Sequence, residues 1–342
     1  MLKIENLRVK KGSFLLEVDF LEVETHEFIG VLGPSGSGKT TLLETIAGFI
    51  EPESGKITFY GHDITRIPPW RRHIAITYEE PHLFPHLTVF QNLTYGKDAC
   101  EKFVLNLSER LGISDLLERY PRELSAGQKQ KVSIIRACAS RPMMLLLDEP
   151  FNFLDPMSKE DLRNLLREIK EEFLMPIILV THDLEEAFYH SDRIILLENG
   201  EIKAIGTSYD LVMNPPDEFV MSFLGKANYI PVDSREGRFF VGSQEIVLPS
   251  NPDKKRFVVM LRPQDIILTR DPSGKGSARN HLKGKVSDII RGQKVNEVKV
   301  DVEGITVLVY ITDAALEELN LEQNESIYLT FKATALRIFD SG

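Results

Sequence analysis

The chain has 342 residues, of which 42% are hydrophobic and 27% are charged, a balance typical of globular proteins. The length predicts roughly two domains, each large enough for its own core. No apolar run reaches the ~18 residues that span a bilayer. Residues 226–342 hold 17 basic and 16 acidic side chains and carry a net charge of +1. Residues 1–225, with 24 basic and 35 acidic side chains, therefore carry −11 against −10 for the whole chain. An acidic body of this kind argues against nucleic acid as a partner, because nucleic-acid binding needs a basic face.

Alternating apolar residues predict a strand pair over residues 2–9 and 14–23, joined near Gly12. Residues 28–32 form a short apolar run suited to a buried strand, and residues 41–47 carry apolar side chains at helical spacing. The segment between them is Gly33-Pro34-Ser35-Gly36-Ser37-Gly38-Lys39-Thr40. It fits Gly-x4-Gly-Lys-[Ser/Thr], the P-loop, in which backbone N–H groups and a helix N-terminus bind phosphates.

The order of strand, loop and helix favours a nucleotide site over an ordinary glycine-rich turn. Lys39 is expected to reach the β- and γ-phosphates, and the Thr40 hydroxyl is expected to bind Mg²⁺. We therefore predict that residues 33–40, together with Thr41, contact the bound nucleotide. The two cysteines, Cys100 and Cys138, have neither metal-ligand spacing nor a disulfide framework, and we expect reduced thiols.

Two further apolar runs end in polar residues. Residues 143–147 are followed by Asp148 and Glu149, and residues 176–181 are followed by His182. Buried parallel strands present such residues at their carboxyl ends, where open α/β sheets bind ligands. Asp148 would hold Mg²⁺ and Glu149 would polarise an attacking water molecule. The alternatives are a surface acid pair and a structural histidine.

A second phosphate contact is predicted where Leu124-Ser125-Ala126-Gly127-Gln128 opens an apolar-periodic helix. A hydroxyl, free N–H groups and the helix dipole suit a phosphate there, although a plain N-cap explains the serine equally well.

Taken in order, these motifs resemble the ATP-binding subunit of ABC transporters. Leu124–Gln128 is similar to that family's Leu-Ser-Gly-Gly-Gln signature, and Asn152-Phe153-Leu154-Asp155 is similar to its D-loop. The resemblance implies an ATPase domain over residues 1–225 with a helical subdomain at about 88–140. It also implies that His182 contacts the γ-phosphate and that Asp155 couples two facing sites.

The resemblance further implies partners. Because ABC sites form between the P-loop of one copy and the signature of another, a chain with one set of motifs is expected to be a homodimer. It would lie at the cytoplasmic face of the cell membrane as a peripheral protein. There it would bind integral-membrane permease subunits of an importer and, through them, serve a substrate-binding protein. Phe84-Pro85-His86 would contact the permease, although this segment could equally be a packed loop.

Three positions depart from the family pattern. Glu79 stands where the family has a glutamine; it could coordinate Mg²⁺ but adds negative charge beside a triphosphate and donates no amide hydrogen bond. Ala126 replaces a glycine, which is tolerable unless the backbone needs positive φ. The aromatic residue that stacks on adenine falls at Lys11, with Phe14 as the nearest substitute. We expect an active but slow ATPase.

Short β-rich segments dominate residues 226–342 and predict a small antiparallel barrel. Within it, Ser277-Ala278-Arg279-Asn280 and the segment around Lys332 resemble molybdate-binding barrel domains. That resemblance implies an oxyanion site of Ser277, Arg279, Asn280 and Lys332, a set of groups that suits a tetrahedral anion. A barrel that binds no ligand and only dimerises is the alternative.

The predicted fold is therefore an α/β P-loop NTPase of the ABC type with a helical subdomain, followed by a small all-β barrel of the OB-like or TOBE kind. The chain resembles the ATPase subunit of a molybdate/tungstate importer, whose barrel could sense the anion and inhibit uptake. A sugar, sulfate, phosphate or iron importer is the second hypothesis. A soluble ABC ATPase acting on ribosomes or DNA is the third, but such proteins usually carry two cassettes or a coiled-coil insertion, and neither is seen.

Overall fold

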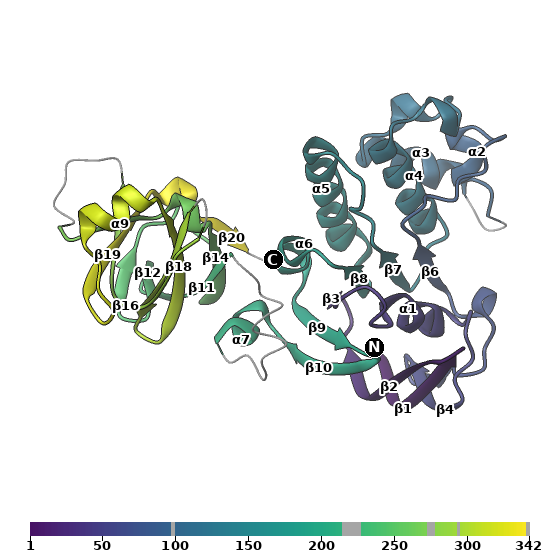
Figure 1. The fold of residues 1–342 in the computed structure, drawn as a ribbon. Coiled ribbons are helices and arrows are strands. Elements are labelled where there is room, and N and C mark those ends of the chain that lie inside the picture. Colours follow the sequence, from purple (N-terminus) through teal and green to yellow (C-terminus); the bar gives the residue numbers. More distant parts are fainter. Residues whose placement is uncertain (97–99, 214–226, 272–277, 293–294, 340–342) are drawn as a thin grey trace. The chain divides into compact units, whose positions relative to one another are not determined.

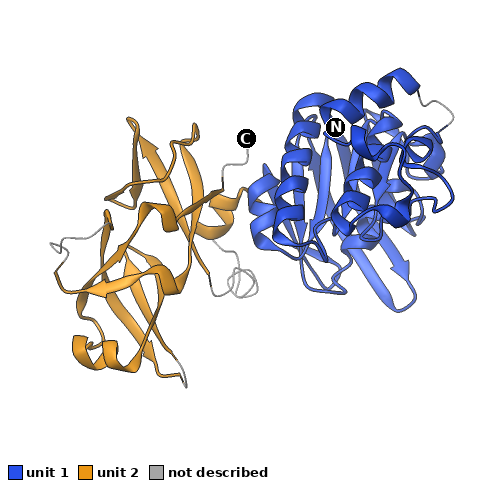
Figure 2. Ribbon diagram, turned by 90° about the horizontal axis from the view of Figure 1, so that it is seen from above, with its two compact units in different colours: residues 1–205 blue, residues 206–342 orange. Residues whose placement is uncertain are grey.

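The structure is a computed structural model that describes residues 1–96, 100–213, 227–271, 278–292 and 295–339. It divides into two compact units, residues 1–205 and residues 206–342 (Figure 2). The domain boundary expected at residues 225 and 226 lies outside the described residues.

Unit 1 is built on a ten-stranded sheet in the order β5-β4-β1-β2-β10-β9-β3-β8-β7-β6. The strands are β1 (Leu2–Lys11), β2 (Phe14–Val23), β3 (Phe28–Leu32), β4 (Ser54–Phe59), β5 (His62–Asp63), β6 (Ile74–Thr77), β7 (Met144–Asp148), β8 (Ile177–Thr181), β9 (Arg193–Glu198) and β10 (Glu201–Gly206). Strands β9, β3, β8, β7 and β6 run parallel, whereas β2, β1, β4 and β5 form antiparallel pairs. The strands expected before the P-loop (β1, β2 and β3) and those expected later in the chain (β7 and β8) are confirmed.

The central strands are buried on both faces. Every residue of β3, β7 and β8 is buried, which explains why these segments are continuous apolar runs. The helices are α1 (Lys39–Ala47), α2 (Val89–Leu93), α3 (Glu101–Arg110), α4 (Ala126–Ala139), α5 (Pro156–Phe173) and α6 (Leu184–His190). Figure 1 shows α2, α3 and α4 together at one end of the unit, where the sequence predicts a helical subdomain.

Two local features fix a turn and a helix end next to this sheet. Asn199 and Gly200 have φ values of 49° and 84°, so they form a tight two-residue hairpin between β9 and β10. The buried guanidinium of Arg72 donates to the carbonyls of Thr45 and Ile46 at 2.9 and 2.8 Å and so satisfies the end of α1. Burial lowers the pKa of Arg72 to about 10.

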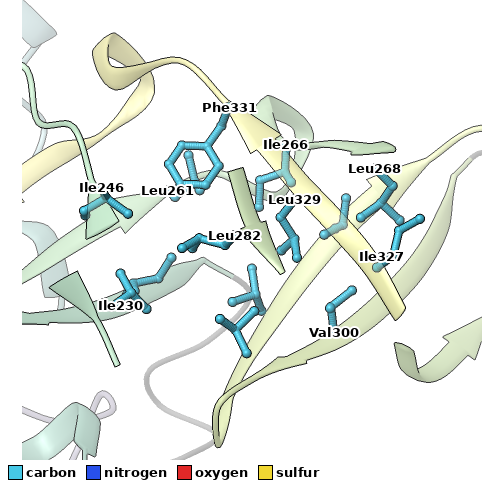
Figure 3. Close-up of a cluster of buried hydrophobic side chains, with 14 of the residues drawn as sticks. Ile230, Ile246, Leu261, Ile266, Leu268, Leu282, Val300, Ile327, Leu329 and Phe331 are labelled. Atoms are coloured by element: carbon cyan, nitrogen blue, oxygen red, sulfur yellow. The ribbon is translucent and has the colours of Figure 1, made fainter. Parts of the chain in front are cut away.

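Unit 2 contains two five-stranded antiparallel sheets that share one apolar core (Figure 3). The first sheet holds β11 (Asn228–Arg235), β12 (Arg238–Val241), β13 (Gln244–Ile246), β14 (Arg256–Leu261) and β20 (Arg337–Phe339). The second holds β15 (Ile267–Thr269), β16 (Asn280–Ile290), β17 (Asn296–Val302), β18 (Ile305–Ile311) and β19 (Ser326–Phe331). Among the described residues, the α-helices of this unit are α7 (Ser208–Met213) and α9 (Asp313–Leu319). The expected all-β class is confirmed.

The two sheets are similar halves that exchange their last strands. Their orders, β13-β12-β11-β14-β20 and β18-β17-β16-β19-β15, correspond strand by strand. Asn228 pairs with Leu261 in the first sheet, as Asn280 pairs with Phe331 in the second. Continuing these registers by one residue places Ala227 opposite Arg262 and Arg279 opposite Lys332. The second half therefore has a cationic residue at both of these positions, whereas the first half has one.

Candidate functional site

The P-loop connects β3 to α1 at the carboxyl edge of the parallel strands. Gly36 and Gly38 have φ values of 81° and 104°, in the left-handed region that glycine adopts readily. A Cβ atom at Gly38 would lie 2.7 Å from Cζ of Phe14, so the ring packs directly on the loop. Phe14, the predicted adenine contact, is thus beside the P-loop. The ammonium of Lys11, the alternative contact, bonds Glu44 of α1 at 2.9 Å.

Lys39 lies folded over its own loop. Its Nζ donates to the carbonyls of Gly33 and Pro34 at 2.8 and 3.1 Å, and it is 3.9 Å from Oε1 of Glu149. The side chain is almost completely buried. Burial lowers the pKa of Lys39, and the charges of Glu149 and Asp148 act against this shift. Thr41 is buried behind the loop, where its carbonyl accepts a hydrogen bond from the Thr45 hydroxyl at 2.7 Å.

Asp148 and Thr40 form the candidate Mg²⁺ site. Burial raises the pKa of Asp148 to about 6, and the neighbouring Thr40 hydroxyl opposes this shift. In the part of the chain that the structure describes, Oδ1 of Asp148 is buried without a hydrogen-bond partner. The described residues as a whole contain no cluster of three or more His, Cys, Asp or Glu side chains suited to a metal. One carboxylate and one hydroxyl fit Mg²⁺, which takes its other ligands from water and substrate phosphates.

Glu149 and His182 meet across the ends of two neighbouring strands. Nδ1 of His182 lies 2.8 Å from Oε2 of Glu149, and the Glu149 N–H donates to the Val180 carbonyl at 2.9 Å. Glu149 has a φ of 49°, which is rare outside glycine and persists only when its surroundings hold it. The pair offers a carboxylate that can accept a proton beside an imidazole that remains largely exposed.

The signature segment Leu124–Gln128 opens α4 through a capping box. Ser125 Oγ accepts from the Gln128 N–H at 3.2 Å, and Gln128 Oε1 accepts from the Ser125 N–H at 3.0 Å. Ala126 is the first residue of the helix and has no positive φ, so its methyl group is tolerated. A Cβ atom at Gly127 would lie 2.5 Å from Ser158 Oγ, so α4 and α5 approach closely there.

Asp155 caps α5 at the same place. Its Oδ1 accepts from the N–H groups of Met157 and Ser158 at 3.0 Å, and its Oδ2 accepts from the Ser158 hydroxyl at 2.6 Å. These hydrogen bonds lower the pKa of Asp155. Signature and D-loop residues therefore meet at Ser158. Among the described residues, no hydrogen bond joins Ser125–Gln128 to the P-loop.

Glu79 contacts Asn152, the first residue of the segment that resembles the D-loop. Asn152 Nδ2 donates to Glu79 Oε1 at 2.9 Å, which links the segment after β6 to the loop after β7. The carboxylates whose charges raise the pKa of Asp148 are those of Glu149 and Glu44. The structure thus places Glu79 beside Asn152.

The expected oxyanion residues differ in their surroundings. Ser277 lies outside the described residues. Arg279 and Lys332 are exposed at the ends of paired strands. The Asn280 side chain is buried: its Oδ1 accepts from the Val247 N–H at 2.6 Å and its Nδ2 donates to the Val247 carbonyl at 3.0 Å. Its counterpart Asn228 bonds the backbone of Leu308 in the same way.

Comparison with known proteins identifies the family of this chain. The family described as ABC transporter matches residues 16–152, and the family described as TOBE domain matches residues 276–338. The molybdate/tungstate import ATP-binding protein of Pyrococcus abyssi is 36% identical over 99% of this chain and 100% of its own length. The chain belongs to the ABC transporter family. The sulfate/thiosulfate import ATP-binding protein 2 of Chromobacterium violaceum is 34% identical over 99% of this ABC chain and 95% of its own.

Solved structures agree with the ABC assignment. A nucleotide-free ATP-binding cassette from an ABC transporter matches with a TM-score of 0.60 and 27% identity, over 66% of this chain and 98% of that one. A dimeric cassette bound to ADP and phosphate, in a post-hydrolysis state, matches with a TM-score of 0.53 and 28% identity, over 60% and 98%. The resemblance drawn from the motifs and the expected fold class are confirmed, and the chain is an ABC-type ATPase.

The raised pKa of Asp148 predicts a stability gain when its charge is removed. The folded state holds the proton up to about pH 6, whereas the unfolded state releases it near pH 4, so stability falls as the pH rises through this window. In metal-free buffer near pH 7.5, we expect Asp148→Asn to raise the free energy of unfolding by about 2 kcal/mol. The gain should be small near pH 4.5, as measured by denaturant titration. The exposed Asp19→Asn is the control, and a gain independent of pH would contradict the assignment.

Proposed function

We propose that the chain is the ATP-hydrolysing subunit of an ABC importer and that its cargo is molybdate or tungstate. The observation that carries the hydrolytic part is the Glu149–His182 pair beside Lys39, at the edge where β3, β7 and β8 end. The importer and its cargo rest on relatives named as molybdate/tungstate import ATP-binding proteins, at 36% and 37% identity over 99% of this chain.

The mechanism follows from the position of each group. The N–H groups of residues 33–40 and the Lys39 ammonium bind the phosphates, and Phe14 offers a ring beside the loop for the base. Thr40 and Asp148 would hold Mg²⁺, and the ion would neutralise phosphate charge. Glu79 would join them only through Oε2, because its Oε1 accepts the Asn152 amide. Glu149 orients the attacking water and accepts its proton, while His182 contacts the γ-phosphate.

A second copy of the chain completes each site. Ser125, Ala126, Gly127 and Gln128 lie at a helix N-terminus that can bind the γ-phosphate of a nucleotide held by another copy. Asp155, which meets this segment at Ser158, would then link the two sites. The match to a dimeric cassette bound to ADP and phosphate supports a homodimer. ATP would close the dimer, and hydrolysis would reopen it.

The proposed permease contact is the loop around Phe84. The Phe84 ring lies 4.4 Å from the ring of the exposed Tyr95, measured between centroids. The buried Asn92 fixes the loop, because it accepts from the Phe84 N–H at 2.9 Å and donates to the Phe84 carbonyl at 3.1 Å. No helix among the described residues is both long and apolar enough to cross a membrane. The names of the relatives as import ATP-binding proteins support integral-membrane subunits in separate chains, with this subunit at their cytoplasmic side.

The cargo assignment has one competitor. Relatives named as sulfate/thiosulfate import ATP-binding proteins are 32–44% identical, so sulfate is the second candidate. We favour molybdate or tungstate because two relatives with that name match 99% of this chain at 36% and 37% identity. Arg279 and Lys332, which adjoin the Asn280–Phe331 pair, offer two cations that suit a tetrahedral dianion of any of these kinds. An anion held there could regulate hydrolysis if it binds one state of the dimer more tightly than the other.

The catalytic assignment predicts a separation of binding from turnover. Because Glu149 supplies the proton acceptor, we expect Glu149→Gln to lower the rate of ATP hydrolysis by roughly 100-fold or more. Nucleotide affinity should stay close to that of the unmodified chain, as measured by fluorescent-nucleotide titration. Glu171→Gln, an exposed substitution on α5, should leave both quantities unchanged. Undiminished hydrolysis by Glu149→Gln would contradict the role of Glu149.

The oxyanion assignment is tested by calorimetric titration of the full chain with tungstate, molybdate, sulfate and phosphate. We expect tungstate and molybdate to bind more tightly than the other two, and Arg279→Ala to weaken that binding by roughly tenfold or more. The control is Arg262→Ala, which removes the exposed cation that corresponds to Lys332 in the other half of unit 2. Equal weakening by both substitutions, or preferential binding of sulfate, would count against the assignment.

A further inference from the structure

Three charged pairs join α5 to α6 and the residues flanking it. Lys159 lies 3.4 Å from Asp183, Arg163 contacts Glu186, and Lys170 lies 3.0 Å from Asp192. The basic partners recur at intervals of four and seven residues, so they occupy one face of α5. That face is thus bonded along its length to the segment that follows His182.

The central pair is buried. The Glu186 side chain is 0% exposed, and its two oxygens accept from Nε and Nη2 of Arg163 at 3.0 and 2.6 Å. Burial raises the pKa of Glu186, and the Arg163 charge opposes this shift; hydrogen bonding to Glu186 raises the pKa of Arg163. A bidentate pair of this kind fixes the relative position of two helices more tightly than an exposed ion pair does.

His190 extends this contact toward the active site. Its ring is stacked between Phe28 and Phe151, with centroid distances of 5.4 and 5.5 Å and interplanar angles of 18° and 24°. Nε2 is buried without a hydrogen-bond partner among the described residues and lies 3.9 Å from Oε2 of Glu186. Burial lowers the pKa of His190 to about 3, so the ring is neutral and acts as a flat packing surface.

Both ends of this network lead to the hydrolytic pair. Phe151 follows Glu149 by two residues, and α6 begins two residues after His182. On the other side, α5 begins directly after Asp155. The positive φ of Glu149 must be maintained by its surroundings. His190 stacks on Phe151, which belongs to the short loop that follows Glu149.

We propose that Arg163, Glu186 and His190 are positioning residues that hold Glu149 and His182 within hydrogen-bond distance of each other. The proposal rests on the catalytic role proposed above for Glu149. A small displacement of a catalytic group lowers turnover steeply, because reaction requires near-attack geometry. The network touches neither the P-loop lysine nor Thr40, so its loss should affect turnover more than nucleotide binding.

The test compares kcat and KM for ATP in variants of the full chain. We expect His190→Ala to lower kcat by roughly tenfold to 100-fold with KM within about twofold, because the stack loses its middle ring. His190→Phe keeps a flat ring and should retain most of the activity. Leu21→Ala is the control, because it leaves a cavity in the core cluster that contains β1 and β2. Measured well below the temperature at which this variant unfolds, its kcat should equal that of the unmodified chain.

A second variant keeps the test decisive if His190→Ala does not fold. Arg163→Met combined with Glu186→Leu replaces the buried pair with apolar side chains, an exchange that often preserves stability. We expect this double variant to melt near the unmodified chain yet to show at least a fivefold lower kcat. Unchanged kcat in a folded double variant, or equal kcat in His190→Ala and Leu21→Ala, would overturn the proposal. Failure of the catalytic assignment looks different, because Glu149→Gln would then remain active.

Discussion

The parallel alignment of β3, β7 and β8 is the constraint on which the rest of unit 1 depends. Leu32 pairs with Thr181 and Asp148 pairs with Val180, so the carboxyl ends of all three strands reach one edge of the sheet. Three segments distant in sequence therefore deliver the phosphate-binding loop, two carboxylates and an imidazole to one place. The signature helix and α5 belong to the same unit, but their first residues contact each other rather than the P-loop.

This edge holds several arrangements that cost stability. A lysine is buried, a carboxylate has a raised pKa, and Glu149 has a positive φ. Such features persist in folded proteins where surrounding packing compensates for them, and they concentrate at functional sites. The interactions that compensate for these features are the packing of the buried strands and the charged and aromatic contacts between α5 and α6.

The sequence predicts local features well. Apolar runs predicted the buried strands and glycine spacing predicted the P-loop, because each depends on neighbouring residues. Contacts between distant residues were not predictable. Asn152 and Glu79 are 73 positions apart, and Arg163 and Glu186 are 23 apart, so no periodicity links them. Asn280 has the chemistry of an anion ligand, but pairing with Val247, which no motif reveals, occupies its amide.

The central claim is that ATP is hydrolysed at a site completed by a second copy of the chain. The most direct test mixes two inactive variants, Lys39→Ala and Ser125→Asp. Aspartate is a good N-cap, so α4 should still form while its charge repels the phosphate. The account predicts that neither variant hydrolyses ATP alone and that the mixture does, because mixed dimers contain one intact site. A mixture as inactive as its parents, with mixed dimers shown to form, would contradict it.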